Sequence, residues 1–354
     1  MAGGTGGHVY PALAIADYLR RKGIALFWLG TKRGLEATVV PAKGYCLLTI
    51  HICGLRGKGL LKWILSPFIL VFALLQSLLI LMRIRPAAVL GMGGFVSGPG
   101  GMAAWLMRIP LCIHEQNAIA GLTNRILAPL ASRVLQAFPE TFPDSVHAQT
   151  TGNPVRTEIE HVPLPDVRMH INGRDPLRIL VIGGSQGARK LNKIVAETLA
   201  LLPREMHLEI RHQTGCKFFT ETAALYNELN YKVHLEPFIE DMAAAYSCTD
   251  VVICRAGALT IAELAAAGAA SILVPFPFAV DDHQTANAHF LAASGAALLL
   301  PEKDLTRENL GSLLQELYVS RPRLLAMAQR ARAQAKPEAT SDVAEACLEA
   351  AYAG

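Results

Sequence analysis

The amino-acid sequence predicts an α/β protein made of two doubly wound domains, and three observations support this fold class. Strand-like apolar runs alternate with helical segments through most of the 354 residues. The apolar runs are continuous, which is typical of parallel strands covered by helices on both faces. Glycine-rich turns lie at 3–8, 91–101 and 183–188, and at least two of them join a buried strand to an amphipathic helix.

The first half should contain strands near 25–29, 46–52, 87–90, 111–114 and 133–137, with helices at 10–21 and 118–131. The second half repeats this scheme, with strands near 178–182, 208–211, 233–235, 251–254 and 271–274, and helices at 190–202, 260–267 and 283–293. The tail from residue 306 has a helical pattern that Pro322 and Pro337 interrupt. We therefore expect an N-terminal domain at 1–153, a proline-rich linker at 154–176, a C-terminal domain at 177–336 and a final helix at 337–354.

Composition limits the class of protein. A content of 52% hydrophobic and 18% charged residues indicates a folded globular chain that is long enough for two cores. The formal net charge of +4 argues against a dedicated nucleic-acid binder, so no nucleic acid is expected among the partners. The seven cysteines form no Cys-x-x-Cys pair, which favours free thiols in a reducing compartment, the cytoplasm, over disulfides or a zinc site.

One segment departs from the alternating pattern. From Trp63 to Met82 all residues are apolar except two serines, a proline and a glutamine, and none is charged. This length approaches the ~20 residues that cross a bilayer. Basic residues flank the segment on both sides: Arg56, Lys58, Lys62, Arg83 and Arg85. A helix lying on an anionic membrane surface is favoured over a buried crossover helix, and over a spanning helix that would split a parallel sheet.

The glycine turns suit anionic groups, because bare backbone N–H groups and helix N-termini attract phosphate. None of the turns matches the G-x-G-x-x-G or the G-K-[ST] pattern, and the chain has no Asp-x-Asp. A bound diphosphate would therefore be neutralised by backbone dipoles and basic side chains, with no metal and no cofactor. Arg156, in the sequence 152–156 at the domain junction, is the candidate arginine, and an ordinary surface arginine is the alternative.

His8 ends the first glycine turn at the start of a predicted helix. The positive potential of a helix N-terminus disfavours the imidazolium, so the ring should stay neutral near pH 7 and be able to accept a proton. We expect His8 to act as the general base for a sugar hydroxyl. A histidine that only donates to a phosphate or caps the helix is the alternative.

Three polar clusters are further site candidates. The sequence 114–117 follows a buried strand, at the strand end where open α/β sheets bind ligands. Thr260 and Glu263 have the spacing of a capping box, but Glu263 could equally accept hydrogen bonds from a ribose diol. The polar residues at 281–287 open a helix and could be a solvated N-terminus.

Taken together, these motifs resemble the MurG family, the bacterial N-acetylglucosaminyltransferases that make lipid II from lipid I in peptidoglycan synthesis. The matching segments run in order along essentially the whole chain: 1–8, 54–59, 91–101, 114–124, 152–156, 183–188, 255–263 and 281–287. The resemblance implies a GT-B fold, with two Rossmann-like domains and an interdomain cleft. It also implies an inverting, metal-independent transfer from UDP-N-acetylglucosamine to the 4-hydroxyl of lipid I at the cytoplasmic face of the inner membrane.

Site residues carried over from the resemblance fall into two groups. UDP-N-acetylglucosamine would bind Thr5, Gly6, Gly7, Asn117, Arg156, Ser185, Ile239, Ala258, Leu259, Thr260, Glu263 and Gln284. Among these, Arg156 and Ser185 would meet the diphosphate, and Ile239 with the turn at 258–263 the uridine. Glu263 would meet the ribose, and Gln284 with Asn117 the sugar. The acceptor pyrophosphate would bind the turns at Gly6, Gly93 and Gly94.

Two other functions stay open at this point. Another GT-B enzyme, such as an epimerase acting on UDP-N-acetylglucosamine, would have no use for an apolar, basic-flanked helix. A membrane-surface scaffold that has lost catalysis would not need the polar residues that all three glycine turns retain. We also expect the natural polypeptide to start several residues before Met1, because the family has a strand before its first glycine turn.

Overall fold

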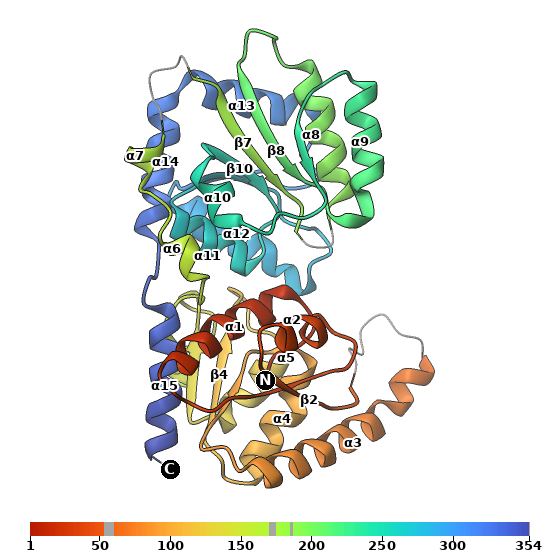
Figure 1. Cartoon of the computed structure of the whole chain (residues 1–354), viewed down its shortest axis with the longest axis vertical. Coiled ribbons are helices and arrows are strands. Elements are labelled where there is room, and N and C mark those ends of the chain that lie inside the picture. Colours follow the sequence, from red (N-terminus) through yellow and green to blue (C-terminus); the bar gives the residue numbers. More distant parts are fainter. Residues whose placement is uncertain (53–59, 170–174, 185–186, 354) are drawn as a thin grey trace. The chain divides into compact units, whose positions relative to one another are not determined.

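The structure is a computed structural model that describes residues 1–52, 60–169, 175–184 and 187–353, without the side chains of 60–65 and 280. It contains two compact units, Met1–Arg156 with Glu338–Gly354, and Thr157–Pro337 (Figure 1). The boundary falls inside the expected linker, so the part from Thr157 onward is packed within the second unit. The C-terminal helix belongs to the first unit.

The second unit contains one parallel sheet of six strands in the order β12-β11-β10-β7-β8-β9. Its strands are β7 (Leu177–Ile182), β8 (Leu208–Gln213), β9 (His234–Glu236), β10 (Val251–Cys254), β11 (Ala270–Leu273) and β12 (Ala297–Leu299). Its helices are α6 (Thr157–Glu160), α7 (Pro165–Arg168), α8 (Arg189–Leu201), α9 (Phe219–Glu228), α10 (Met242–Ser247), α11 (Ala258–Ala267), α12 (His283–Ala293), α13 (Arg307–Val319) and α14 (Arg321–Ala333).

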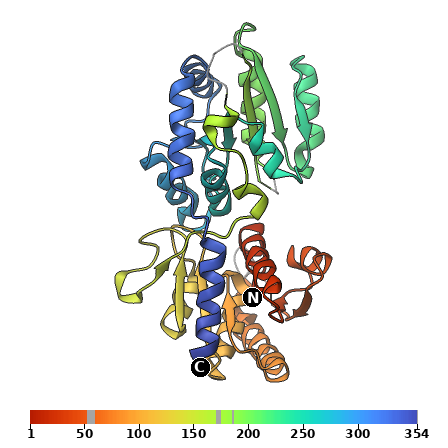
Figure 2. The ribbon, with the colours of Figure 1, turned by 60° about the vertical axis from the view of Figure 1, so that its left-hand side comes forward.

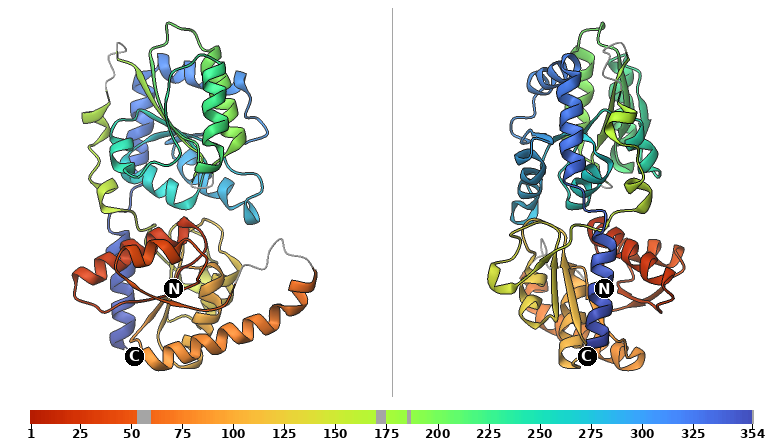
Figure 3. Two further views of the ribbon diagram at one scale, coloured as in Figure 1. Left: turned by 45° about the vertical axis from the view of Figure 1, so that its right-hand side comes forward. Right: turned by 90° about the vertical axis from the view of Figure 1, so that its left-hand side faces the viewer.

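This strand order makes the second unit doubly wound. The chain runs outward from β7 to β9, returns to β10 beside β7, and then runs outward in the other direction to β12. Right-handed crossovers in opposite directions place helices on both faces of the sheet, as Figure 3 shows. The direction reverses between β7 and β10, where a doubly wound sheet opens a crevice at its carboxyl edge. This position is therefore the candidate ligand site of the second unit.

The first unit contains two parallel sheets, one of β1 (Phe27–Gly30) and β2 (Cys46–Thr49), and one in the order β3-β4-β5-β6. The second of these comprises β3 (Val89–Gly91), β4 (Leu111–Glu115), β5 (Arg133–Gln136) and β6 (Gln149–Thr150). The helices are α1 (Gly6–Arg21), α2 (Glu36–Ala42), α3 (Leu60–Ile84), α4 (Gly94–Leu106), α5 (Leu122–Leu127) and α15 (Ala339–Ala353).

The first two residues lie between these two sheets. The Met1 carbonyl accepts the N–H of Met92 at 2.9 Å, next to the end of β3. On the other side, the indole of Trp28 in β1 donates to the Ala2 carbonyl at 2.9 Å. Ala2 is fully buried, in the same core cluster as Trp28 and Met92. This short segment therefore joins the two sheets into one core.

Helix α15 is part of the first unit's core although it is the last element of the chain. Figure 2 shows it beside α1 and the strands of the larger sheet, and it packs against α1, β4 and β5. Its Val343 and Ala344 are fully buried with Leu13 of α1. Small side chains on this face let the helix approach the sheet closely.

Helix α3 covers the expected apolar segment and packs against α4 along one narrow stripe (Figure 1). Ala73, Ser77 and Leu81 are buried on that stripe. Other large apolar side chains of the helix are exposed: Phe68, Leu70, Val71, Phe72, Leu75, Leu79 and Met82. The segment Ser66–Ile84 is long and apolar enough to cross a membrane, and only 17% of its most apolar window is buried. The alternative of a helix buried in the core is therefore wrong.

The structure contains all ten strands that the sequence predicts. Its described residues form two further strands that the sequence pattern does not predict. Strands β6 and β12 have only two and three residues. Strands this short carry too few side chains for a hydrophobic period to show. Both lie at the edge of a sheet, so missing them did not change the fold class.

Candidate functional site

The carboxyl ends of β7 and β10 lie side by side in the second unit. Ile182 pairs with Cys254, and the N–H of Arg255 donates to the Ile182 carbonyl at 3.3 Å. The turn after β7 uses Gly184 and Gly187 at positive φ, and a Cβ on Gly187 would lie 2.4 Å from the Thr214 carbonyl. The chain thus turns tightly at the switch point. Ser185, expected at the diphosphate, lies outside the described residues.

The turn after β10 leads directly into α11. This helix starts at Ala258 with Gly257 as its N-cap, so Thr260 lies inside the first turn and does not cap it. The capping-box alternative for Thr260 and Glu263 is therefore wrong. Glu263 is only 6% exposed, and the hydroxyl of Tyr246 donates to its Oε2 at 3.2 Å. A buried carboxylate oriented by a neutral donor is suited to recognising hydroxyl groups.

Gln213, at the end of β8, links two of the expected ligand-binding loops. Its Oε1 accepts the backbone N–H of Ile239 at 2.8 Å, and its Nε2 donates to the Gly184 carbonyl at 3.4 Å. Gln213 is 3% exposed and Ile239 1%. The expected uridine contact at Ile239 is therefore tied to the glycine turn after β7. Sequence reasoning missed Gln213, because one glutamine after a strand carries no motif.

Two polar side chains of α12, those of Gln284 and Asn287, make hydrogen bonds to backbone groups of the loops after β10 and β11. The Oε1 atom of Gln284 accepts the N–H of Phe276 at 2.9 Å. Asn287 is fully buried and donates to the Ala256 carbonyl at 3.2 Å. The second unit thus gathers Ala258, Leu259, Thr260 and Glu263 on α11 next to the turn after β7, with Gln284 on α12 packed against α11.

In the first unit, His8 and the second glycine turn lie together. His8 is in the first turn of α1, with its Nδ1 3.5 Å from the Thr5 hydroxyl oxygen. A Cβ on Gly93 would lie 3.4 Å from His8 Nε2 and 3.3 Å from Asn124 Nδ2. Gly94 has φ +74°, and its Cβ would lie 2.9 Å from the Gly3 carbonyl. The fold brings the N-termini of α1 and α4 together around the His8 ring.

The side chain of Glu36 stabilises the first glycine turn by hydrogen bonding. This fully buried carboxylate accepts the Gly4 N–H at 3.1 Å, the Thr31 N–H at 3.0 Å and the Thr31 hydroxyl at 2.7 Å. A Cβ on Gly34 would lie 2.1 Å from Glu36 Oε2, so glycine is needed there. No sequence motif marks Glu36, because most of its partners are backbone groups that only the fold assembles.

The cluster at 114–117 is mainly a support and not a ligand surface. His114, Glu115 and Gln116 are at most 3% exposed. His114 Nε2 donates to the Gly152 carbonyl at 2.9 Å, while its Nδ1 accepts from Gln116 Nε2 at 3.0 Å. Burial lowers the pKa of His114 to about 4, so the ring is neutral. The network therefore holds the segment before Arg156 in place without adding charge.

Asn117 is the member of that cluster that stays partly exposed. Both its backbone N–H and its side-chain amide donate to Glu115 Oε1, at 3.0 and 3.2 Å. Glu115 Oε2 accepts from Gly121 N and Asn124 Nδ2 at 3.0 and 2.9 Å, so one carboxylate orients both asparagines. Arg156 is half-buried at the end of the first unit. Within the described ranges, no group of three or more His, Cys, Asp or Glu side chains could hold a metal.

Comparison with known proteins gives matches over both units. The glycosyltransferase family 28 N-terminal domain matches residues 1–136, and the family 28 C-terminal domain matches residues 178–343. A protein of Nitrosococcus oceani named UDP-N-acetylglucosamine–N-acetylmuramyl-(pentapeptide) pyrophosphoryl-undecaprenol N-acetylglucosamine transferase is 53% identical, over 99% of this chain and 98% of its own length. The protein of the same name from Alkalilimnicola ehrlichii is 52% identical, with the same coverage.

Solved structures agree with these sequence matches. MurG of Acinetobacter baumannii superposes with a TM-score of 0.83 at 41% identity, over 99% of this chain and 98% of that one. A UDP-GlcNAc 2-epimerase from Neisseria meningitidis shares the fold, with a TM-score of 0.67 over 97% of each chain, at only 12% identity. The chain therefore has the GT-B fold and belongs to glycosyltransferase family 28, within the MurG family of N-acetylglucosamine transferases.

Proposed function

We propose that this protein transfers N-acetylglucosamine from UDP-N-acetylglucosamine to the 4-hydroxyl of the N-acetylmuramoyl group of lipid I, giving lipid II and UDP. The observation that carries this function is the 53% identity to a named transferase along nearly the whole chain. An epimerase remains compatible with the fold, but its 12% identity supports the fold alone.

The donor site is assigned to the switch point of the second unit. Glu263 accepts hydrogen bonds from the ribose, and Ile239 with the start of α11 surrounds the uracil. The turn after β7, which includes Ser185, is assigned to the diphosphate and Gln284 to the sugar. In the first unit, the family resemblance assigns Arg156 to the diphosphate and Asn117 to the sugar. Support comes from the adjacent ends of β7 and β10 and from the buried Glu263 carboxylate beside them.

The acceptor site is assigned to the first unit, where Gly6, Gly93 and Gly94 present backbone N–H groups to the pyrophosphate of lipid I. His8 takes the proton of the acceptor hydroxyl while that oxygen forms a bond to the anomeric carbon. The bond from that carbon to the diphosphate breaks on the opposite face, so UDP leaves with the negative charge and the configuration inverts. The closeness of His8 Nε2 to Gly93 supports this arrangement.

The test of the function is UDP release from UDP-N-acetylglucosamine with a lipid I analogue as acceptor and excess EDTA present. We expect acceptor-dependent release that EDTA does not reduce. Release that needs magnesium would contradict the metal-independent mechanism. Formation of UDP without any acceptor, together with N-acetylmannosamine, would support the epimerase instead.

We also propose that α3 attaches the protein to the cytoplasmic surface of the inner membrane. Its exposed apolar side chains would enter one leaflet, and Arg83 and Arg85 at its end would face anionic headgroups. Of the other expected basic residues, Arg56 and Lys58 lie outside the described residues, as does the side chain of Lys62. A surface position leaves β2 and β3, which flank α3, within one unit.

Vesicle sedimentation tests this attachment. Binding to anionic vesicles should weaken with salt, and each basic residue removed should cost about 1 kcal/mol of binding. Leu79→Glu should reduce binding strongly, because Leu79 is 64% exposed on α3. Val319→Glu, at an apolar residue that is 82% exposed in the second unit, is the matched control and should leave binding unchanged. Extraction from membranes by detergent but not by salt or carbonate would point to a spanning helix.

A further inference from the structure

Among the described residues, Tyr246 has the largest fully buried side chain. Its phenol hydroxyl also makes a hydrogen bond. It lies on α10, which packs against α11. Its hydroxyl donates to Glu263 Oε2 at 3.2 Å. A buried phenol that donates to a buried carboxylate fixes where the carboxylate oxygens point, because both groups are costly to leave without partners.

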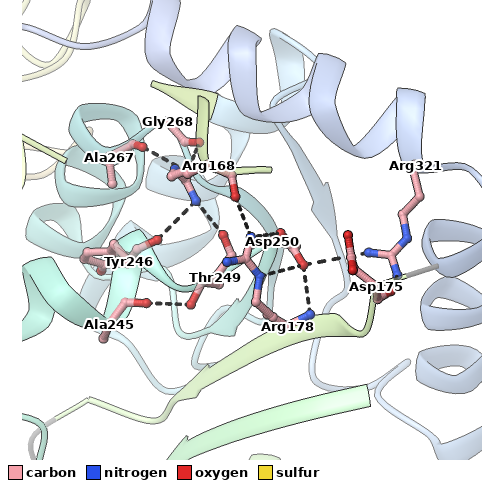
Figure 4. A network of polar contacts seen from close by, with 10 residues as sticks. All are labelled: Arg168, Asp175, Arg178, Ala245, Tyr246, Thr249, Asp250, Ala267, Gly268 and Arg321. Carbon is pink, nitrogen blue, oxygen red and sulfur yellow. Dashed lines mark hydrogen bonds and ion pairs between the residues drawn. The ribbon is translucent and has the colours of Figure 1, made fainter. Parts of the chain in front are cut away.

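The backbone of Tyr246 is held as firmly as its side chain. Figure 4 shows the Arg168 guanidinium among four backbone carbonyls, those of Tyr246 and Thr249 at the C-terminal end of α10 and those of Ala267 and Gly268 at the C-terminal end of α11. One positive group thus joins the C-terminal ends of both helices, where carbonyl groups and the helix dipole favour a cation. The two helices are therefore fixed at one end by Arg168 and linked across their bodies by the Tyr246–Glu263 hydrogen bond.

The C-terminal end of α11 also packs tightly against α7. Gly268 has φ +61°, and a Cβ there would lie 2.9 Å from Cγ of Pro165 on α7. Helix α7 brings both Pro165 and Arg168 against the ends of α10 and α11. With the helices locked in this way, the hydroxyl of Tyr246 on the neighbouring helix lies where it can orient the Glu263 carboxylate.

We propose that Tyr246 is a positioning residue that orients the Glu263 carboxylate toward the ribose diol and thereby sets the preference of the enzyme for a ribonucleotide donor. The proposal rests on the assignment of Glu263 to the ribose. Without the hydroxyl, the carboxylate turns toward other partners and meets the diol less well. The loss concerns ground-state binding of the ribose, so it falls on donor KM and not on the chemical step.

The experiment compares UDP-N-acetylglucosamine with its 2′-deoxyribose analogue in the wild type and in Tyr246→Phe. We expect Tyr246→Phe to raise KM for the ribose donor about five- to tenfold at unchanged kcat, the size of one ordinary hydrogen bond. KM for the deoxyribose donor should change much less, so discrimination between the two donors should fall. An equal rise of both KM values would show a general loosening of the site and would overturn the proposal.

Tyr226→Phe is the matched control. Tyr226 is also buried in the second unit, at 3% exposure, and its hydroxyl is 2.9 Å from His212 Nδ1. This variant loses a buried phenol hydroxyl without touching Glu263, so both KM values should stay at wild-type levels. If Tyr246→Phe does not fold, Tyr246→Met offers a second variant without the hydroxyl, because methionine adapts to irregular cavities. Its donor discrimination should fall in the same way.

Glu263→Gln separates this proposal from the function on which it rests. If Glu263→Gln keeps the wild-type preference for ribose, the assignment of Glu263 to the ribose is wrong. If it loses that preference while Tyr246→Phe keeps it, the ribose assignment stands and the role of Tyr246 is wrong. In the double variant, Tyr246→Phe should add no further change in discrimination, because its effect runs through Glu263.

Discussion

At the residue scale, each unit has a buried carboxylate that accepts hydrogen bonds from neighbouring segments, Glu36 in the first unit and Glu263 in the second. Glu36 accepts hydrogen bonds from the first glycine turn and from Thr31, and Glu263 accepts one from Tyr246. Desolvating a carboxylate is costly unless hydrogen bonds compensate, so each group fixes its surroundings. The two groups differ in their partners, since Glu36 accepts mostly from backbone N–H groups and Glu263 accepts from the side chain of Tyr246.

The general-base role of His8 predicts a selective loss of turnover. His8→Ala should lower kcat by about two to four orders of magnitude, the range for a lost general base. The Kd of UDP-N-acetylglucosamine should hardly change, because most donor contacts are assigned to the second unit. Steady-state kinetics and calorimetric binding measure the two effects. His147→Ala, at an exposed histidine of the same unit, should leave both unchanged. Near-normal turnover of His8→Ala would remove His8 from the mechanism.

The position of Glu36 predicts a structural loss at the first glycine turn. Glu36→Gln replaces one accepting oxygen by an amide NH2 group, which donates and cannot accept, so the N–H group of Gly4 or of Thr31 loses its partner. Unfolding free energy from urea titration should fall by about 1–3 kcal/mol, the cost of an unsatisfied buried group. Glu349→Gln, an exposed change in the same unit, serves as control. Equal stability of the two variants would refute this account of the turn.

At the scale of elements, the helix ends of the second unit explain two glycines. Helix α11 ends at Gly268 and α12 is followed by Gly295, both at positive φ. A Cβ on Gly268 would meet the Pro165 ring at 2.9 Å, whereas one on Gly295 would meet the Arg330 guanidinium at 2.6 Å. The ring cannot move without shifting α7, but the end of a long side chain can turn away.

This contrast predicts different costs for the same substitution. Gly295→Ala should lose about 1–2 kcal/mol of unfolding free energy, for a left-handed alanine. Gly268→Ala should lose a further 1–3 kcal/mol, the range for overpacking a tight contact. Circular dichroism during urea unfolding measures both in one background. If the two variants lose the same amount, the contact between α7 and the end of α11 does not stabilise the unit.

At the scale of the whole molecule, the described part of each unit contains a deeply buried neutral histidine. Burial lowers the pKa of His114 to about 4 in the first unit and of His212 to about 3 in the second. His212 is satisfied while neutral, because its Nδ1 lies 2.9 Å from the Tyr226 hydroxyl and its Nε2 lies 3.1 Å from Asn192 Oδ1. Protonation of either ring therefore opposes folding.

The sign of the pH dependence follows from these pKa values. In the unfolded chain His114 takes up a proton near pH 6.5, but in the folded unit only near pH 4. Between these values the unfolded state binds more protons, so the free energy of unfolding should fall as the pH drops, by up to about 1.4 kcal/mol per pH unit. Above pH 6.5 this contribution is constant.

Tryptophan fluorescence isolates this effect in the first unit, because Trp28, Trp63 and Trp105 all belong to it. Urea unfolding followed by this signal at pH 7 and pH 5 should show a smaller pH dependence in His114→Gln than in the wild type. His147→Gln, at an exposed histidine, should keep the wild-type dependence. An unchanged dependence in His114→Gln would mean that other groups cause the acid sensitivity.

The sequence by itself determined the fold class, the positions of most strands, the family and the exposed character of α3. These properties depend on the hydrophobic period and on glycine turns. Both features involve residues close together in the chain, so they can be recognised in the sequence. The start of α11 is the instructive exception, since the spacing of Thr260 and Glu263 fits a capping box but Gly257 is the N-cap. The same four residues satisfy either geometry, and the preceding strand decides where the helix begins.

Only the tertiary structure decided which polar residues support the site and which remain open to ligand. His114, Glu115 and Gln116 are candidate ligand contacts in the sequence, but they are buried and hydrogen-bond to neighbouring segments or to each other, whereas Asn117 is partly exposed. Glu36 and Tyr246 left no sequence signal, because Gly4 lies 32 residues from Glu36 along the chain and Glu263 lies 17 residues from Tyr246. Hydrogen bonds between distant segments form only when packing has brought those segments together, and no local period encodes them.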